Sequence, residues 1–370
     1  MRPEAIAAME PYLRGTFANP SGAHRAARQA RRAIDDARDV VAEAVGAQPG
    51  EIVFTGGGSE ADNTAVFGVA RRHGGRILCS AFEHHAVLEP VEHLGGQLIR
   101  VTDRGVLDLD HLDELLDADV RLVSVMAVNN EVGTIQPVPE IVERVRRQAP
   151  QALVHTDAVQ ALCWLDVAEL AGGVDLVAIS GHKFGGPKGC GALVVGQGVS
   201  IEPLIMGGGQ ERDRRGGTHN VAGIVALAEA ARLTVEERVA TVTRVGALRD
   251  RLVAGLRHQI PDLVETGVVG NDRSHKIAGN AHVCIPGIET EALLVLLERH
   301  DVLASAGSSC ASGAMEPSHV LAAMGVDRQL AFGSLRLTLG HETADAEIDS
   351  ALDVIPAAVE QLRVGIPAAS

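Results

Sequence analysis

A glycine-rich run near residue 57 could bind an anion. Residues Phe54–Glu60 read FTGGGSE and lie between a predicted strand and a predicted helix. Backbone N–H groups at the start of a helix attract negative charge, so this turn would suit a phosphate. The run matches neither the GxGxxG pattern of dinucleotide sites nor a Walker loop. An ordinary turn in which Ser59 caps the helix is the alternative interpretation.

Asp157 and Lys183 each follow a predicted buried strand. An acid at the carboxyl end of such a strand lies where open α/β sheets bind ligands. A lysine flanked by glycines could react with a carbonyl group, while Ser180 and His182 could donate hydrogen bonds to a phosphate. Pyridoxal enzymes need such a lysine, and an acid that keeps the pyridine nitrogen protonated. A helix-capping Asp157 and a solvated loop lysine are the alternatives, but the order of glycine turn, acid and lysine favours a cofactor site.

Three further segments could act on a substrate. Cys310 lies among the small residues of 304–314, which would leave its thiol accessible to react, although cysteine is more often a small buried hydrophobe. Arg336 stands in an apolar strand and needs either a substrate carboxylate or an acid of the protein as its partner. The glycines and arginines of 207–218 suit a phosphate or carboxylate, or else form a mobile polar loop. The other cysteines, which we interpret as buried hydrophobes, are Cys79, Cys163, Cys190 and Cys284.

Composition limits the class of protein. A length of 370 residues predicts two domains. The net charge of -15 and the lack of a Lys/Arg-rich run argue against direct nucleic-acid binding. The 5 cysteines form no CxxC pair, so we expect neither a metal site nor a disulfide framework. Free thiols, no signal-peptide pattern and no membrane-length apolar run predict a cytoplasmic protein without membrane contact.

Short apolar runs alternate with helical patterns along the chain. This alternation predicts a mostly parallel sheet with helices on both faces. The helical pattern of 24–45 places its arginines and aspartates on the exposed side. The helical stretch 225–259 is expected to lead into a smaller α+β domain. The expected strands are 51–55, 76–80, 97–101, 121–128, 152–155, 175–179, 281–285 and 334–339, and the further helices are 59–71, 137–148, 289–300 and 344–364.

Taken together, these motifs resemble the cysteine desulfurases of the IscS/NifS type, which are class V members of the fold-type I pyridoxal-phosphate enzymes. The resemblance runs nearly the whole length of the chain. The Gly-Ser-Ser-Cys setting of Cys310 resembles the subgroup with a long cysteine loop. The matching segments are NPSGAH at 19–24, FTGGGSE at 54–60, EHHAVL at 83–88, NNEVGT at 129–134, SGHK at 180–183, GGGQER at 207–212, GSSC at 307–310 and SLR at 334–336.

The resemblance implies a fold and a division into domains. A three-layer, mostly parallel seven-stranded sheet would form the large cofactor-binding domain of residues 1–240. A smaller α+β domain, 241–370, would carry the cysteine loop, and the first ~12 residues would pack with it. In this family a short strand with an Asp-x-Ala-Thr-Thr type segment usually precedes the point where this chain begins. The sequence as given is therefore expected to lack that wall of the substrate site.

The resemblance also implies pyridoxal 5'-phosphate as cofactor and a role for each matching residue. Lys183 would bind the cofactor covalently and later move the substrate Cα proton. His84 would stack on the pyridine ring and assist proton transfer, Asp157 would pair with its nitrogen and Gln160 would reach its phenolic oxygen. Phosphate would be bound by Gly58, Ser59, Ser180 and His182, and by Thr218 of the neighbouring subunit. The substrate would be held by Asn19, Asn130 and Arg336, with Asn130 also near the cofactor.

The implied reaction converts L-cysteine to L-alanine and leaves the sulfur on Cys310 as a persulfide. The family further implies a homodimer and a sulfur-accepting protein, either an iron–sulfur scaffold or a tRNA-thiolation enzyme. Gly58-Ser59 replaces the usual Ala/Gly-Thr, and serine keeps the hydroxyl. Another fold-type I enzyme, such as a selenocysteine lyase or an aminotransferase, and a non-catalytic scaffold relative are the alternatives. Cys310 argues against an aminotransferase, which needs no nucleophile.

Overall fold

The chain folds into two compact units. The computed structural model describes residues 1–307 and 317–365. Unit 2 contains two short segments from the N-terminal half of the chain in addition to the C-terminal part. Unit 1 consists of Met1–Ile99, Asp108–Val128 and Gln136–Arg238, and unit 2 of Arg100–Leu107, Asn129–Ile135 and Val239–Ser370.

Unit 1 is built on a seven-stranded sheet with the order β1-β7-β6-β5-β4-β2-β3. Strands β6, β5, β4, β2 and β3 run parallel to one another, whereas β7 is antiparallel to both β6 and β1. Most strand residues are buried, as expected for a sheet covered on both faces. The strands are β1 Ile52–Thr55, β2 Arg76–Ser80, β3 Gln97–Ile99, β4 Val120–Ser124, β5 Leu153–Asp157, β6 Leu176–Ser180 and β7 Gly191–Val195.

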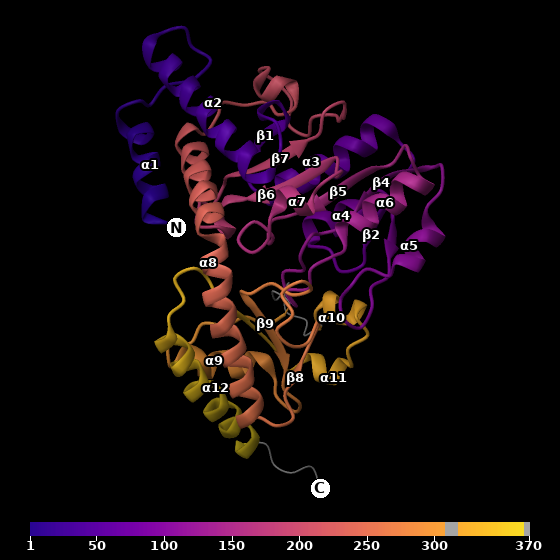
Figure 1. Ribbon diagram of the computed structural model, residues 1–370, viewed down its shortest axis with the longest axis vertical. Helices are drawn as coiled ribbons and strands as arrows, with labels where there is room; N and C mark the ends of the chain where they lie inside the picture. The colour runs from indigo at the N-terminus through magenta and orange to yellow at the C-terminus, as the bar shows by residue number, and fades with distance from the viewer. Residues whose placement is uncertain (308–316, 366–370) are drawn as a thin grey trace. The chain divides into compact units, whose positions relative to one another are not determined.

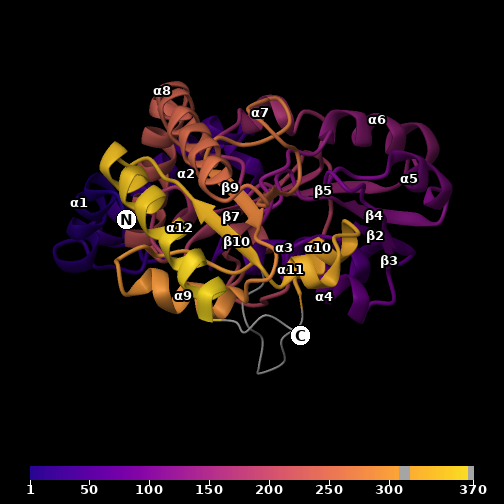
Figure 2. The ribbon, with the colours of Figure 1, turned by 90° about the horizontal axis from the view of Figure 1, so that it is seen from below.

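Helices cover both faces of this sheet, which gives three layers. Figure 2 shows α6 and α7 on one side of the strands and α3 and α4 on the other. The helices and 3-10 turns of unit 1 are α1 Pro3–Arg14, α2 Arg25–Val45, η1 Pro49–Glu51, α3 Gly58–His73, α4 His85–His93, α5 Leu109–Leu115, α6 Val138–Gln148, α7 Val167–Leu170, η2 Gly181–Lys183 and η3 Gln210–Asp213. Helix α8, Val221–Gln259, belongs to unit 1 up to Arg238 and to unit 2 beyond it.

Helix α3 packs closely against the sheet because its inner face is made of small residues. Ala61 and Ala65 are fully buried in the same core cluster as Val53 and Leu193. Gly68 allows an even closer approach, since a Cβ atom there would lie 2.8 Å from the carbonyl oxygen of Glu202. With aromatic residues at only 2% of the chain, such close packing of aliphatic and small side chains fills the interior. The start of α3 is thereby held firmly above the strand ends.

Unit 2 contains a small antiparallel sheet with helices packed on it. The order is β10-β9-β8, and α9 and α12 lie side by side in both views (Figures 1 and 2). Its elements are β8 Val264–Glu265, β9 Asn280–Cys284, α9 Thr290–Glu298, α10 His319–Ala323, α11 Arg328–Ala331, β10 Ser334–Thr338 and α12 Asp345–Gly365. No helix within the described residues is long and apolar enough to cross a membrane.

The structure confirms the expected mostly parallel, seven-stranded α/β fold and adds elements that the sequence did not predict. Helix α1 and strand β7 are among them. Arg2 lies within unit 1, where its N–H donates to Gly185 (2.8 Å) and its guanidinium pairs with Glu237 (2.8 Å). The expectation was that these first residues would pack with the smaller domain. Arg38 was wrongly expected on the exposed face of α2, since it is only 8% exposed.

Candidate active site

The turn between β1 and α3 presents the open start of a helix. Gly57 precedes the helix with φ 143°, a conformation that favours glycine, and no side chain caps this end. A Cβ atom at Gly58 would lie 2.8 Å from Val159 Cγ2 and 3.3 Å from Ser180 Cβ. The interpretation of Ser59 as the cap is wrong, because Ser59 lies inside the first turn and is exposed. The first N–H groups of α3 therefore remain available to an anion.

Strand β6 delivers the lysine segment to the same place. Ser180 is the last residue of β6 and is buried against Gly58, and its Oγ lies 3.0 Å from His182 Nδ1. Burial, together with the charges of Lys183 and Lys188, lowers the pKa of His182, so that its ring is neutral near pH 7. Lys183 follows in η2 with its side chain exposed, and its carbonyl accepts a hydrogen bond from Cys163 Sγ (3.3 Å).

Asp157 lies beside the glycine turn and the end of β6. It ends β5, is 5% exposed, and its Oδ1 accepts a hydrogen bond from the Val159 N–H (2.8 Å). Burial raises the pKa of Asp157 to about 6, against the lowering effects of that N–H group and of Lys183. The bond to Val159 closes a local turn, but no helix begins there, so Asp157 does not cap a helix. Since Val159 also touches the Gly58 position, the structure brings the glycine turn, the acid and the end of β6 together.

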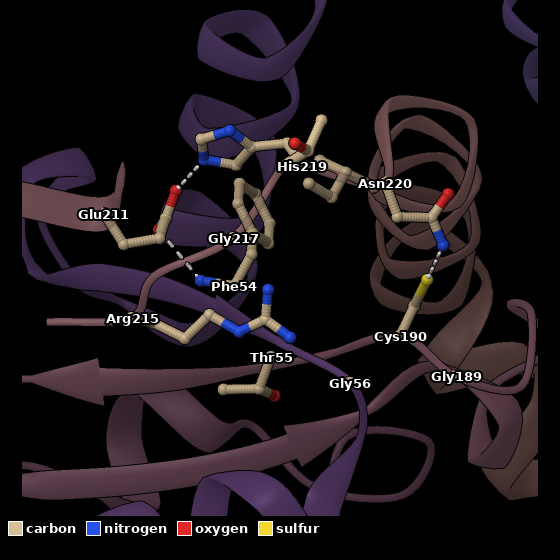
Figure 3. A pocket seen from close by; sticks show the side chains of 12 residues that line it. Phe54, Thr55, Gly56, Gly189, Cys190, Glu211, Arg215, Gly217, His219 and Asn220 are labelled. Atoms are coloured by element: carbon tan, nitrogen blue, oxygen red, sulfur yellow. Dashed lines mark hydrogen bonds and ion pairs between the residues drawn. The ribbon is translucent and has the colours of Figure 1, made fainter. Parts of the chain in front are cut away.

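Three other predicted cofactor residues lie at the surface of unit 1. His84 precedes α4, and its Nδ1 accepts a hydrogen bond from the Ala86 N–H (3.0 Å), so a neutral ring carries its proton on Nε2. Gln160 is half-buried, three residues after Asp157. Thr218 is exposed and lines the pocket of Figure 3. Asn19, predicted to hold substrate, makes local hydrogen bonds to Ser21 (3.0 Å) and Gly22 (3.1 Å).

The pocket with Thr218 is organised by Glu211, which sequence reasoning overlooked. Figure 3 shows this carboxylate between His219 and the backbone of Phe54, at 2.6 and 2.9 Å. Arg38 donates two more hydrogen bonds to it, at 2.8 and 2.7 Å. Burial alone would raise the pKa of Glu211, but the bonds from Arg38 and His219 hold it at about 2. The segment 207–218 is therefore anchored through Glu211. An arginine on the apolar stripe of α2, Arg38, was the feature of the sequence that could have indicated a buried acidic partner.

In unit 2, Arg336 makes no ion pair with a carboxylate of the described residues. It lies on β10 opposite His282 of β9, and its Nη1 donates to the carbonyl oxygen of Asn130 (3.3 Å). Its Nε is buried without a hydrogen-bond partner, and among the described residues it forms no ion pair with a carboxylate, although Glu131 is near enough to feel its charge. The alternative interpretation, in which Arg336 forms a structural ion pair with an acid of the protein, is thus not supported within the described part of unit 2. Arg336 keeps the capacity to bind a carboxylate from outside the protein.

Glu131, next to Asn130, is a second buried group that the sequence did not single out. Its Oε2 accepts a hydrogen bond from Ser318 Oγ (2.5 Å). A Cβ atom at Gly307 would lie 2.9 Å from the same oxygen. Burial raises the pKa of Glu131 to about 7, although Ser318 and Arg336 act to lower it. The segment NNEVGT drew attention only to Asn130.

The described cysteines are not activated thiols. Cys310 lies outside the described residues, so the structure gives no account of it. Burial raises the pKa of Cys284 and Cys163 to about 12 and that of Cys190 to about 11. Cys79 is fully buried and its pKa is also well above the usual value. The interpretation as small hydrophobes is confirmed for Cys79, Cys190 and Cys284, which are buried, while Cys163 is half-buried.

The family model described as aminotransferase class-V matches residues 1–351 of this chain. The chain belongs to this family. The IscS-like cysteine desulfurase of Mycobacterium tuberculosis is 44% identical over 98% of the chain and 94% of that relative. The cysteine desulfurase IscS of Methanosarcina thermophila is 43% identical, with 98% and 90% covered. A solved structure named NifS-like protein has a TM-score of 0.90 and 35% identity, with 98% and 96% covered. The family prediction is confirmed.

Members of this family use pyridoxal phosphate, and the predicted cofactor is confirmed with the family. The residues of unit 1 fit this group. The uncapped start of α3 and the space kept open by Gly58 suit a phosphate, and the buried Asp157 suits a protonated pyridine nitrogen. The exposed Lys183 suits an aldehyde. No group of three or more potential metal ligands is present among the described residues.

Proposed function

We propose that this chain is a pyridoxal-phosphate-dependent L-cysteine desulfurase, which converts L-cysteine to L-alanine and retains the sulfur on Cys310. The prediction of an enzyme of this type is confirmed by curated relatives of that name across nearly the full chain. The observation that carries the proposal is the meeting of Gly58, Asp157 and the Lys183 segment at the strand ends of unit 1.

The residues of unit 1 would hold the cofactor and move protons. Gly58, Ser59, Ser180 and His182 bind its phosphate, and Asp157 pairs with its ring nitrogen. When bound, pyridoxal phosphate supplies an electron sink that makes the substrate Cα proton removable. The amine of Lys183, in its neutral form, takes that proton as a general base. His84 would stack on the ring and assist proton transfer, and Gln160 would bind the phenolic oxygen.

The residues of unit 2 would bind the substrate and receive its sulfur. Arg336 and Asn130 hold the carboxylate of L-cysteine, and Arg336 has the unused donor for it. Cys310 Sγ, as a thiolate, attacks the substrate sulfur. The new S–S bond forms as the C–S bond breaks, and its electron pair passes to carbon, which takes up a proton to give alanine. No external oxidant is needed, because the two thiols become one persulfide and one C–H bond.

Elimination supports Cys310 as the nucleophile. A thiolate is the reactive form of cysteine. The four described cysteines have pKa values raised by burial, so each stays protonated at neutral pH. Cys310 is the remaining cysteine of the sequence. Its neighbours at positions 305 to 309 are small.

The assembly and the cellular role also belong to the proposal. The enzyme forms a homodimer in which Thr218 reaches the phosphate of the neighbouring subunit, and Asn19 contributes to substrate binding. The large domain corresponds to residues 1–240 and the small domain to 241–370. The persulfide passes to an iron–sulfur scaffold protein or a tRNA-thiolation enzyme in the cytoplasm. The name IscS of the relatives supports the first of these acceptors.

The test measures sulfide and alanine formed from L-cysteine in the presence of a thiol reductant. We expect equal amounts of both products from the wild type. Cys310→Ala should lose at least roughly 100-fold in rate while keeping the visible absorption of the cofactor, because it removes a nucleophile. Cys284→Ala, a change at a buried cysteine, is the matched control and should stay active.

Other outcomes separate the alternatives. Undiminished sulfide release by Cys310→Ala would remove the assigned acceptor. Alanine formation that requires a keto acid indicates an aminotransferase. Turnover of selenocysteine but not cysteine indicates a selenocysteine lyase, and a chain that never acquires visible absorption with added cofactor indicates a scaffold.

A further inference from the structure

A row of buried polar side chains lies between α3 and the sheet, beside Asp157. Successive side chains of a strand point to opposite faces, so His155 and Asp157 of β5 share the face that α3 covers. Asp62 of α3 reaches this face, with its Oδ1 3.5 Å from His155 Nε2. Asp62 is 1% exposed and His155 is 0% exposed. Buried polar groups are costly in an otherwise apolar core, so a function is expected for them.

The two facing atoms have no other partner. Asp62 Oδ1 and His155 Nε2 are both buried, and neither makes a hydrogen bond, either to the other or elsewhere. The second ring nitrogen, His155 Nδ1, lies 2.8 Å from the Oγ of Ser124. Ser124 stands opposite His155 in the register of β4 and β5, so this contact is set by the sheet itself. His155 is therefore fixed on one side by Ser124 and faces Asp62 on the other.

The surroundings decide the charge of this pair. Within the described residues no lysine or arginine lies within 4.0 Å of Asp62. The carboxyl groups of Asp157 and Glu83 act electrostatically on Asp62, and in the same way Glu83 acts on Cys79 and Lys183 acts on Asp157. Burial first, and then Asp157 and Glu83, raise the pKa of Asp62 well above its usual value, while burial lowers the pKa of His155 to about 3.

A neutral Asp62 gives a consistent set of hydrogen bonds. A protonated Asp62 would point an O–H at His155 Nε2, 3.5 Å away, and the ring would then carry its proton on Nδ1 and donate to Ser124 Oγ. An ionised Asp62 would instead place a second negative charge near Asp157 in a buried region. Like charges in such a site cannot both be kept, and one of the two acids would take up a proton.

We propose that Asp62 and His155 are positioning residues for the cofactor, a neutral pair that leaves Asp157 as the acid that carries the negative charge toward the ring nitrogen. This rests on the proposed function in one respect, namely that Asp157 faces that nitrogen. The pair acts through Asp157 and touches neither substrate nor cofactor.

The first experiment compares the wild type with Asp62→Asn, both as the full chain with bound cofactor. Asparagine resembles a protonated aspartate but cannot ionise. An acid with a raised pKa loses stability as pH rises, so the melting temperature of Asp62→Asn should gain on the wild type between pH 6 and 8, by about 1–2 °C for each pH unit. Asp110→Asn, at an exposed position, should show a constant difference. A constant or falling difference for Asp62→Asn would mean that Asp62 is an anion, and the proposal would fail.

The second experiment follows the visible absorption of the bound cofactor across pH. Asp62→Asn should titrate within about 0.3 pH unit of the wild type, whereas removing a real charge would shift the midpoint by roughly one unit. His155→Leu leaves the Asp62 O–H to seek Asp157 as acceptor. A hydrogen bond from Asp62 to Asp157 would compete with the interaction between Asp157 and the nitrogen of the cofactor ring. We therefore expect the midpoint of the absorption titration to fall by roughly one pH unit. His155→Gln can accept from Asp62 and donate to Ser124, and should restore the wild-type midpoint.

The outcomes distinguish this inference from the proposed function. Equal midpoints for His155→Leu, His155→Gln and the wild type would show that the pair does not communicate with the cofactor. If His155→Leu fails to fold, the pH-dependent stability of Asp62→Asn still decides the charge of the pair. If Asp157→Asn leaves the absorption unchanged at every pH, the role of Asp157 fails, and with it this part of the proposed function.

Discussion

Arg38 of helix α2 donates two hydrogen bonds, of 2.8 and 2.7 Å, to the carboxylate of Glu211, which lies 173 residues further along the chain. This pair joins a helix that covers the sheet to the segment that carries Thr218. Glu211 itself has φ 48° and is followed by two further residues with positive φ. Such backbone is unfavourable for residues other than glycine, so the bonds to Glu211 must offset its cost.

Glu211→Gln should destabilise the protein by about 3 kcal/mol at pH 7, because it leaves the Arg38 charge buried without its partner. The pKa of Glu211 is lowered to about 2, so its stabilising effect is present above the usual glutamate pKa and is lost as pH falls toward 2. Denaturant unfolding at pH 7, 5 and 3 should therefore show a shrinking difference between variant and wild type. Glu236→Gln, in the exposed pair with Arg232, is the control and should have little effect. A difference that stays the same down to pH 3 would contradict the assignment.

Glu131→Gln should behave in the opposite way. Burial raises the pKa of Glu131 to about 7, so its stabilising contribution is complete at low pH and is lost as pH rises through 7. Glutamine keeps an acceptor for Ser318 but cannot ionise. We expect equal stability near pH 5 and an advantage of about 2–3 kcal/mol for the variant at pH 9, measured by denaturant unfolding. The exposed Glu289→Gln should show no such trend, and a variant that loses stability at high pH would refute this reading of Glu131.

Gly58→Ala tests the phosphate cradle. The added Cβ would lie 2.8 Å from Val159 Cγ2, so the turn must shift. We expect cofactor affinity to fall roughly 10–100-fold, as overpacking of this kind costs about 1–3 kcal/mol. Equilibrium titration of the cofactor-depleted chain with pyridoxal phosphate measures it. Gly50→Ala, where a Cβ meets nothing within 4 Å, should bind normally. Unchanged affinity of Gly58→Ala would place the phosphate elsewhere.

Lys183→Ala should lose the borohydride-reducible adduct with the cofactor. Peptide mapping by mass spectrometry after reduction should find the adduct at position 183 in the wild type and nowhere in the variant. Turnover should fall by roughly 1,000-fold, since proton transfer by a positioned group is lost. Lys188→Ala, at an exposed lysine in the same loop, should retain both the adduct and the activity. A reducible adduct that persists in Lys183→Ala would overturn the assignment.

Arg336→Lys should raise KM for L-cysteine by roughly 10–100-fold with a smaller change in kcat. Lysine keeps the charge but cannot form the bidentate contact with a carboxylate. The absorption of the bound cofactor should not change. Arg328→Lys, at an exposed position of unit 2, serves as the control. An unaltered KM would leave Arg336 with a structural role only.

The sequence predicted the architecture because strand and helix patterns alternate clearly in unit 1. It revealed neither strand β7 nor that this strand runs antiparallel to both β1 and β6, since a buried apolar run carries no sign of its direction. The candidate residues Gly58, Asp157 and Lys183 were singled out because each stands at or just after a strand in a recognisable order, and their roles remain predictions.

Other groups were missed for a different reason. Glu211, Asp62 and His155 acquire their meaning only from partners distant in the sequence. A glutamate in a surface loop, an aspartate in a helix and a histidine in a strand are each ordinary, so the residue type alone gave no signal. For Arg38 a signal existed, because it continues the buried stripe of Ile34 and Val41 on α2.

Helix α3 holds Gly58 at its first residue and Asp62 one turn later. In the proposed function, one turn of α3 would therefore serve both the phosphate end and, through His155 and Asp157, the ring end of the cofactor. Inserting or deleting a single residue between these positions would rotate one group by about 100° relative to the other. Homologous sequences that bind the cofactor in this way should therefore vary in residue type across 59–61 but not in the length of that segment.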